Sequence, residues 1–164
     1  MRKVGFLVFV LPLVLAVPRF EPIQPEVFST GANFMNAWAD IDGDSDLDLF
    51  VGFNGTPNRM YRNNSGMFID IASAVGLADA RATRAGSFGD FDGDGDLDLF
   101  ITNGGWVGAQ HNDLYRNDGN GVFTHLTNAV PALDIGHFES SAWGDYDNDW
   151  YPDLFVADIK PLPG

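Results

Sequence analysis

The 164-residue sequence contains no cysteine. This absence excludes a disulfide framework and a cysteine nucleophile, so rigidity must come from sheet packing or from bound metal ions. A Gly-x-Ser-x-Gly nucleophile elbow is also missing. The sequence therefore shows no recognisable motif for nucleophilic catalysis.

Basic residues are few, with 9 Lys and Arg against 23 Asp and Glu, and the formal net charge is −14. Such a charge disfavours binding to nucleic acid, whose phosphates are also negative. Apolar residues make up 45% of the chain and aromatic residues 13%, enough for a hydrophobic core. We therefore expect a folded domain with no nucleic-acid partner.

The acidic residues are concentrated in three ladders that begin at Asp40, Asp90 and Asp145, and these hold 14 of the 23 acidic side chains. Carboxylates at every second residue repel one another unless an oxygen-seeking cation such as Ca²⁺ lies among them. Mg²⁺ fits less well, because it keeps its waters and demands a stricter octahedron. The ladders predict about three bound Ca²⁺ ions.

Numbered from its first Asp, each ladder offers side-chain oxygens at positions one, three, five and nine, and a backbone carbonyl at position seven. The third ladder supports this assignment, because Tyr151 stands at its seventh position. The predicted metal ligands are Asp40, Asp42, Asp44, Asp46 and Asp48; Asp90, Asp92, Asp94, Asp96 and Asp98; and Asp145, Asp147, Asp149, Tyr151 and Asp153. At position four, Gly43, Gly93 and Asn148 suit a sharp turn with positive φ.

An EF-hand is the nearest alternative for these loops. It requires Gly at the sixth position, Glu at the twelfth and flanking helices. The sixth positions hold Ser45, Gly95 and Trp150, and the twelfth hold Val51, Ile101 and Val156. The flanks are typical of strands, so the EF-hand is excluded.

A second motif, Tyr-Arg-Asn followed by an Asn- and Gly-rich turn, recurs at residues 61–66 and 115–121 and predicts a hairpin in each unit. Each unit then has an aromatic-rich strand, an acidic loop, an apolar strand and a hairpin. This order predicts an all-β fold built from β-propeller blades of four antiparallel strands. The predicted repeats are residues 33–71, 85–127 and 138–157, which make two full blades and a half blade.

At these residues the chain resembles the FG-GAP-like, or VCBS, calcium-loop repeats of seven-bladed propellers, including those of integrin α subunits and many bacterial secreted proteins. The resemblance covers about residues 33–157. It implies Ca²⁺ in a loop between two adjacent strands of a blade, within a seven-bladed propeller. The Gly-Ala-Pro phrase of the integrin repeat is missing, so integrin-like ligand binding is not implied.

Propellers typically need four to eight blades to close. The repeats therefore belong to a longer propeller, join other copies of the chain, or stay as an open stack with exposed edges. We favour the first of these, partly because the third unit has no hairpin.

The first residues, Met1-Arg2-Lys3, precede an apolar run over 4–17, which is typical of a signal peptide spanning residues 1–16. Residues 17–32 are then a lead-in, and residues 33–164 form the repeat segment. We expect the protein to be secreted, periplasmic or at the cell surface, with no integral membrane span once the signal is removed. Calcium is plentiful outside cells, which suits loops of modest affinity.

Three aromatic residues, Trp38, Phe88 and Trp143, precede a ladder by two residues, and this shared register predicts core positions between blades. Trp106 and Trp150 break the register and are the predicted exposed contact residues. The histidines at 111, 125 and 137 lie at unrelated places in the repeats, which favours structural roles.

These features together predict a non-catalytic, calcium-binding adhesion or binding scaffold with a protein or carbohydrate ligand. The alternative is that the repeats are the propeller portion of a secreted enzyme, such as a polysaccharide lyase or a phospholipase.

Overall fold

The structure is a computed structural model that describes residues 21–28, 33–129 and 134–159. The described chain is all-β, with three antiparallel sheets stacked in chain order, a further small two-stranded sheet and a short helix, α1 (Pro25–Phe28). The predicted signal peptide, residues 1–16, lies outside the described residues.

Two of the sheets are four-stranded meanders with the same design. The first runs β1 (Asn33–Ala39), β2 (Asp48–Phe53), β3 (Arg59–Asn64) and β4 (Met67–Asp70). The second runs β5 (Thr83–Gly89), β6 (Asp98–Asn103), β8 (Asp113–Asn117) and β9 (Phe123–His125). The third sheet has only β11 (Phe138–Gly144) and β12 (Asp153–Asp158). The predicted antiparallel four-stranded sheets are thus confirmed, and the fold resembles propeller blades without forming a closed ring within these residues.

The first two strands of each sheet pair in one register. Trp38 lies opposite Leu49, Phe88 opposite Leu99 and Trp143 opposite Leu154. Each first strand also carries an irregularity after its first residue, at Phe34, Arg84 and Glu139. The repeat therefore extends to details of strand pairing.

One insertion distinguishes the second unit. Between β6 and β8 the chain forms the 3-10 helix η1 (Gly105–Val107) and β7 (Gln110–His111), which pairs with β10 (Ile135–Gly136). The first unit has only five residues, 54–58, at this place. Sequence reasoning did not predict this small sheet, because two-residue strands leave no periodic pattern.

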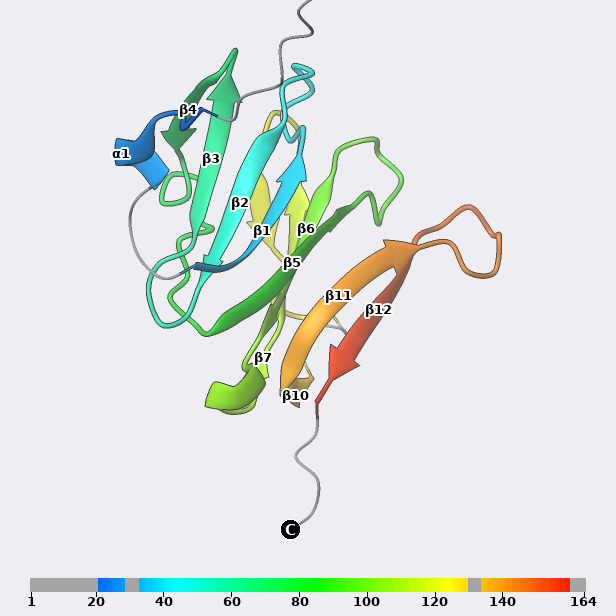
Figure 1. The fold of residues 1–164 in the computed structure, drawn as a ribbon. Coiled ribbons are helices and arrows are strands. Elements are labelled where there is room, and N and C mark those ends of the chain that lie inside the picture. The colour runs from blue at the N-terminus through cyan, green and yellow to red at the C-terminus, as the bar shows by residue number, and fades with distance from the viewer. Residues whose placement is uncertain (1–20, 29–32, 130–133, 160–164) are drawn as a thin grey trace, which may run out of the picture.

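The three sheets pack through their first strands, with β5 in contact with β1 and β2 on one side and with β11 on the other (Figure 1). We call the side of each sheet that faces the next sheet along the chain its front, and the opposite side its back. Phe50 and Phe100 lie on the front of their sheets and are fully buried. The equivalent Phe155 is 69% exposed, because no described sheet lies in front of it.

The prediction for the register aromatics was correct for two residues and wrong for one. Phe88 and Trp143 are partly buried between sheets. Trp38 is 50% exposed, because no described sheet lies behind β1. Trp38 makes an edge contact with Phe68 of its own sheet instead.

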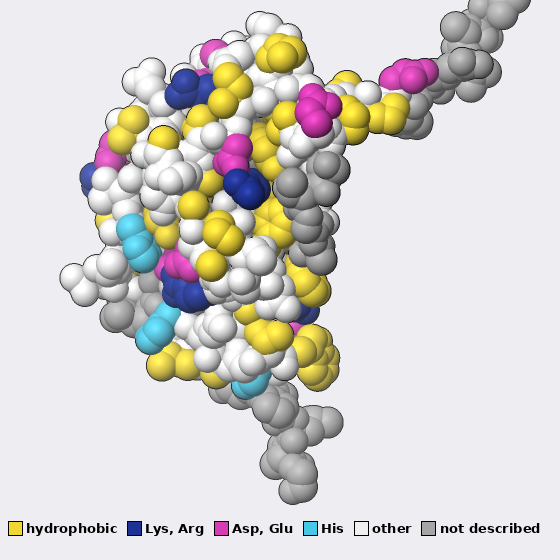
Figure 2. Space-filling view, turned by 90° about the vertical axis from the view of Figure 1, so that its left-hand side faces the viewer, with side chains coloured by type: hydrophobic (Ala, Val, Ile, Leu, Met, Phe, Trp, Pro, Cys, Tyr) yellow, Lys and Arg dark blue, Asp and Glu magenta, His cyan; other side chains and the backbone are white. Residues whose placement is uncertain are grey.

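The helix α1 packs on the back of the first sheet. Val27 and Phe28 contact the apolar cluster there, and the ring of Phe28 lies 4.9 Å from that of Tyr61. The side-chain amide of Gln24 accepts a hydrogen bond from the backbone N–H of Phe68 and donates one to its carbonyl. The face in Figure 2 carries charged side chains of both signs, scattered between hydrophobic ones. Within the described residues, no helix has the length and apolar character needed to cross a membrane.

Candidate metal centres

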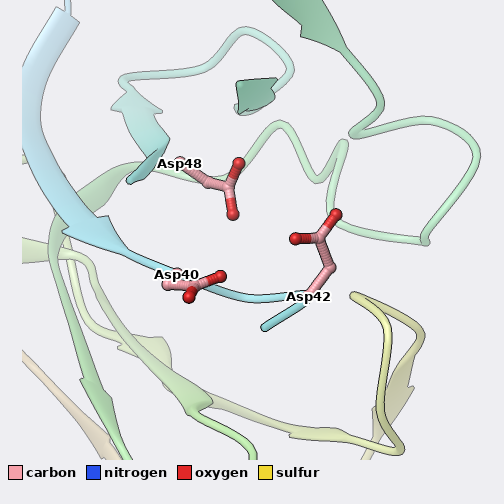
Figure 3. A group of neighbouring side chains, drawn as sticks. All are labelled: Asp40, Asp42 and Asp48. Atoms are coloured by element: carbon pink, nitrogen blue, oxygen red, sulfur yellow. The ribbon is translucent and has the colours of Figure 1, made fainter. Parts of the chain in front are cut away.

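Each acidic ladder forms the loop between the first two strands of its sheet. In the first loop, carboxylates from Asp40, Asp42 and Asp48 converge on a common space (Figure 3). Each contributes one oxygen, and these oxygens lie within 4.8 Å of one another. The second loop gathers Asp90, Asp92 and Asp94 in the same way, and the third gathers Asp145, Asp147 and Asp153.

The other predicted ligands lie outside these three groups: Asp44, Asp46, Asp96, Asp98, Asp149 and Tyr151. Some of them have other contacts. The Asp44 carboxylate accepts the backbone N–H of Asp46 at 2.8 Å, and the Asp46 carboxylate accepts that of Ser65 at 2.7 Å. Asp46 therefore ties the loop to the hairpin that follows.

The first aspartate of each loop organises the turn. Asp40 accepts backbone N–H groups from Gly43, Asp44 and Ser45 at 2.8–3.2 Å. Asp90 makes the same three bonds in the second loop. In the third loop Asp145 accepts two such groups, from Asp149 and Trp150, so a single carboxylate holds the turn of each loop.

Two positions in every loop have positive φ. The prediction at position four is confirmed, with φ of 75° at Gly43, 77° at Gly93 and 61° at Asn148. Position six also has positive φ, at Ser45, Gly95 and Trp150. Sequence reasoning missed the sixth position, because these three residues share no conformational preference.

The ninth position has a structural role that sequence reasoning also missed. Asp48 and Asp98 are fully buried, and each carboxylate accepts two backbone N–H groups. Asp48 accepts the N–H of Ile41 in the loop at 2.9 Å and that of Asn63 in the third strand at 2.7 Å. Asp98 accepts the N–H of Phe91 in the loop at 2.9 Å and that of Asn117 in the third strand at 2.8 Å. These aspartates therefore join the loop to two strands.

Burial raises the pKa of Asp98 to about 6, although its two hydrogen bonds act in the opposite direction, and the nearby carboxylates of Asp92 and Asp94 raise it further. The pKa of Asp48 is raised for the same reasons, with Asp42 and Asp44 as its neighbours. Negative charge is therefore costly at these positions, and a bound cation would relieve that cost.

A carboxylate oxygen in the first loop lacks any hydrogen-bond donor. Oδ1 of Asp42 is buried and has no partner among the described residues. The other oxygen, Oδ2, lies 3.2 Å from Nε of Arg62. Because buried polar atoms are normally paired, Oδ1 fits a metal ligand facing its ion. The donor set is entirely oxygen, as Ca²⁺ requires.

The comparison with protein families gives one match, between residues 40–101 and the model of the FG-GAP-like repeat. This segment is therefore similar to FG-GAP-like repeats. It holds the first two acidic loops and runs from β2 into β6, so the resemblance predicted from the sequence is confirmed there. The FG-GAP-like repeat and the antiparallel sheets together indicate a β-propeller-like domain. None of the curated proteins compared with the chain matches it.

Proposed function

We propose that this protein is an exported, calcium-binding, propeller-like scaffold without catalytic activity. The observation that carries the proposal is the recurrence of one carboxylate cluster in three loops, with a buried and unpaired oxygen at Asp42 in the first. FG-GAP-like repeats suit this proposal, since calcium is the ion that such loops commonly hold.

The ligands offered first are the three members of each cluster, because their oxygens already converge. A divalent cation there would offset the repulsion between the carboxylates. In the first loop it would also fix the loop against β3, since Asp48 of that cluster accepts backbone N–H groups from both. Binding energy would then appear as folding stability.

Two exposed tryptophans support a binding role for the scaffold. Trp106, in η1, is 83% exposed, and Trp150, in the third acidic loop, is 92% exposed. Exposed aromatic residues are typical of contact surfaces for proteins or carbohydrates. We propose one of these two ligand classes as the partner.

Two of the described histidines, His125 and His137, have structural partners, which supports a role without catalysis for them. Nε2 of His125 lies 2.9 Å from a carboxylate oxygen of Asp113, and its ring stacks on Tyr115. Nδ1 of His137 lies 2.7 Å from the carbonyl oxygen of Gly105. The proposal of export rests on the basic and then apolar residues at 1–16.

Thermal unfolding in calcium, in magnesium and in a chelator tests the proposal. We expect a higher melting temperature in calcium, because a ligand that binds only the folded state stabilises it, by about 2.7 kcal/mol per site at 100 times its dissociation constant. Magnesium at the same concentration is the control and should have a smaller effect. An identical melt in all three solutions would contradict calcium binding.

A further inference from the structure

The contact between neighbouring sheets follows one pattern. An aromatic residue on the back of a sheet packs on the front of the preceding sheet, next to a small residue that ends its first strand. Phe88 of β5 packs against the buried cluster that contains Ala39 and Phe50. Trp143 of β11 packs on Gly89 and on Phe100, and the rings of Trp143 and Phe100 lie 6.4 Å apart.

The second of these contacts is close. A Cβ atom on Gly89 would lie 2.5 Å from Cγ of Trp143, so this indole requires glycine beneath it. The indole N–H donates to the carbonyl of Ser87 at 3.2 Å. The hydroxyl oxygens of Ser87 and Ser141 lie 2.8 Å apart across the same contact. We call the surface formed by Gly89 and Phe100 the seat of Trp143. The size of the seat therefore matches the size of the indole.

The front of the third sheet offers the same seat without an occupant among the described residues. Gly144 is the register equivalent of Gly89, and a Cβ placed on it meets no described atom within 4 Å. A hollow of about 520 Å³ lies here, lined in part by Ala142, Gly144 and Phe155. Phe155 occupies the position of the fully buried Phe100 but is 69% exposed.

The matching aromatic residue is present on the opposite end of the stack. Trp38 is the register equivalent of Trp143, lies on the back of β1 and is half exposed. The same face also has a hollow of about 350 Å³, lined by Asn36 and Trp38 of β1 and bordered by Phe28 of α1. A tryptophan on one end thus corresponds to a glycine seat on the other, as in the contact between the second and third sheets.

The helix α1 does not close the back face along β1. Its aromatic contacts are to Tyr61 on β3 and Phe68 on β4. On the back of β1, Trp38 remains 50% exposed. Since the contacts between sheets are made chiefly by first strands, β1 is the part that needs to be free.

We infer that copies of this chain associate head to tail, with β1 of one copy packed on the front of β11–β12 of another. Trp38 of the copy that contributes β1 packs on Gly144 of the other copy and lies against Phe155 of that copy. The interface continues the contact pattern that already joins the sheets within one chain. It joins two different surfaces, so it produces rings or linear assemblies and not a symmetric pair. The inference does not depend on calcium binding.

Cysteine cross-linking tests this arrangement, and the chain has no other cysteine. The equivalents of Ser87 and Ser141 across the inferred interface are Ala142 of one copy and Asn36 of the other. Mixing Ala142→Cys with Asn36→Cys protein under air oxidation should give a disulfide-linked heterodimer. Mixing Asn36→Cys with Ser73→Cys, which is exposed elsewhere, is the control for random collision. A cross-link that forms no faster than this control, or forms between Ala142→Cys molecules alone, would overturn the inference.

Sedimentation of two further variants tests the seat. Trp38→Ala removes the aromatic residue, and Gly144→Val fills the seat, where a Cβ atom meets no described atom within 4 Å. Each variant alone should be monomeric, a mixture of the two should form a dimer and nothing larger, and wild type should form larger species. A wild type that stays monomeric up to its solubility limit would refute the inference, as would variants that assemble like wild type. Melting temperature verifies that both variants are folded.

Discussion

The aspartates of the acidic loops have two different roles. Some stabilise the fold of the loop, and others face its centre. The first and ninth positions accept backbone N–H groups, and they shape the loop and attach it to neighbouring strands. In the first loop the third position, Asp42, presents an oxygen without a donor. A substitution should therefore weaken folding at some positions and metal binding at others.

In the second loop we expect Asp92→Asn with Asp94→Asn to abolish one calcium site and leave the others. These two carboxylates belong to the converging group, and neutral amides are weaker ligands. Asp96→Asn is the matched control, because position seven is assigned a backbone carbonyl. Calorimetric titration measures the number of sites. A larger loss in the control than in the double variant would contradict the assignment.

Asp98 should make stability depend on pH in the absence of calcium. Its pKa is about 6 in the folded protein and near 3.8 when unfolded, so between these values the folded state binds more protons. In chelator, the free energy of unfolding should rise as the pH falls from 7.5 to 5.5. Urea unfolding at several pH values measures this, with Asp98→Asn expected to flatten the slope. A fall in stability over that interval would contradict it.

The same acidification should lower calcium affinity, since protons and the cation compete for carboxylates. Titrations at pH 7.5 and pH 5.5 test the competition. An equal calcium affinity at the two pH values would show that protonation of Asp98 does not affect the metal site.

Residue spacing alone predicted the acidic loops and the positive φ at position four. It did not predict the buried, doubly bonded state of Asp48 and Asp98, because that state depends on backbone groups from a strand about 15–19 residues further along. Nor did it predict positive φ at Trp150, where a bulky residue adopts a conformation that the other two loops assign to serine and glycine.

Among the elements, the contact between β5 and β11 depends on the lack of a side chain at Gly89. Gly89→Ala would place a Cβ 2.5 Å from Trp143 and should destabilise the protein by about 1–3 kcal/mol, as overpacking does. Gly144→Ala is the matched control and should be nearly neutral in the monomer, because the equivalent space is open. Urea unfolding measures both. Equal effects of the two substitutions would refute the description of this contact.

Asn117 connects the two full repeats. Its side-chain N–H donates to the carbonyl of Ile41 in the first acidic loop at 2.8 Å, and the residue is fully buried. Asn117→Ala should cost about 1–3 kcal/mol, the cost of an unsatisfied buried group. Asn63→Ala is the control, since Asn63 is half-buried and its side-chain N–H donates to Leu47 of its own unit, as Asn117 also donates to Leu97. A larger effect of the control on the free energy of unfolding would argue against this connection.

The strand order within each unit could be predicted because β2 and β6 contain apolar segments bounded by turns, and both strands are buried along their whole length. The insertion that holds η1 and β7 could not, because its residues follow no alternation. The bidentate pair between Arg84 and Glu139 was equally invisible, since it joins residues 55 positions apart at two strand irregularities.

For the whole molecule, the sequence indicated that aromatic residues at one register lie between sheets. The rule applies wherever a neighbouring sheet is present, and Trp38 departs from it because no described sheet lies behind β1. Whether a register position is buried thus depends on what stands next to the sheet, which the local sequence does not contain.

The central claim is that the three acidic loops bind calcium. These loops hold most of the acidic residues of a chain with a net charge of −14. Calorimetric titration of the wild-type protein with calcium tests that claim most directly. The account predicts about three bound ions per chain, one for each loop. A titration with no heat of binding beyond dilution, in protein shown to be folded, would contradict it.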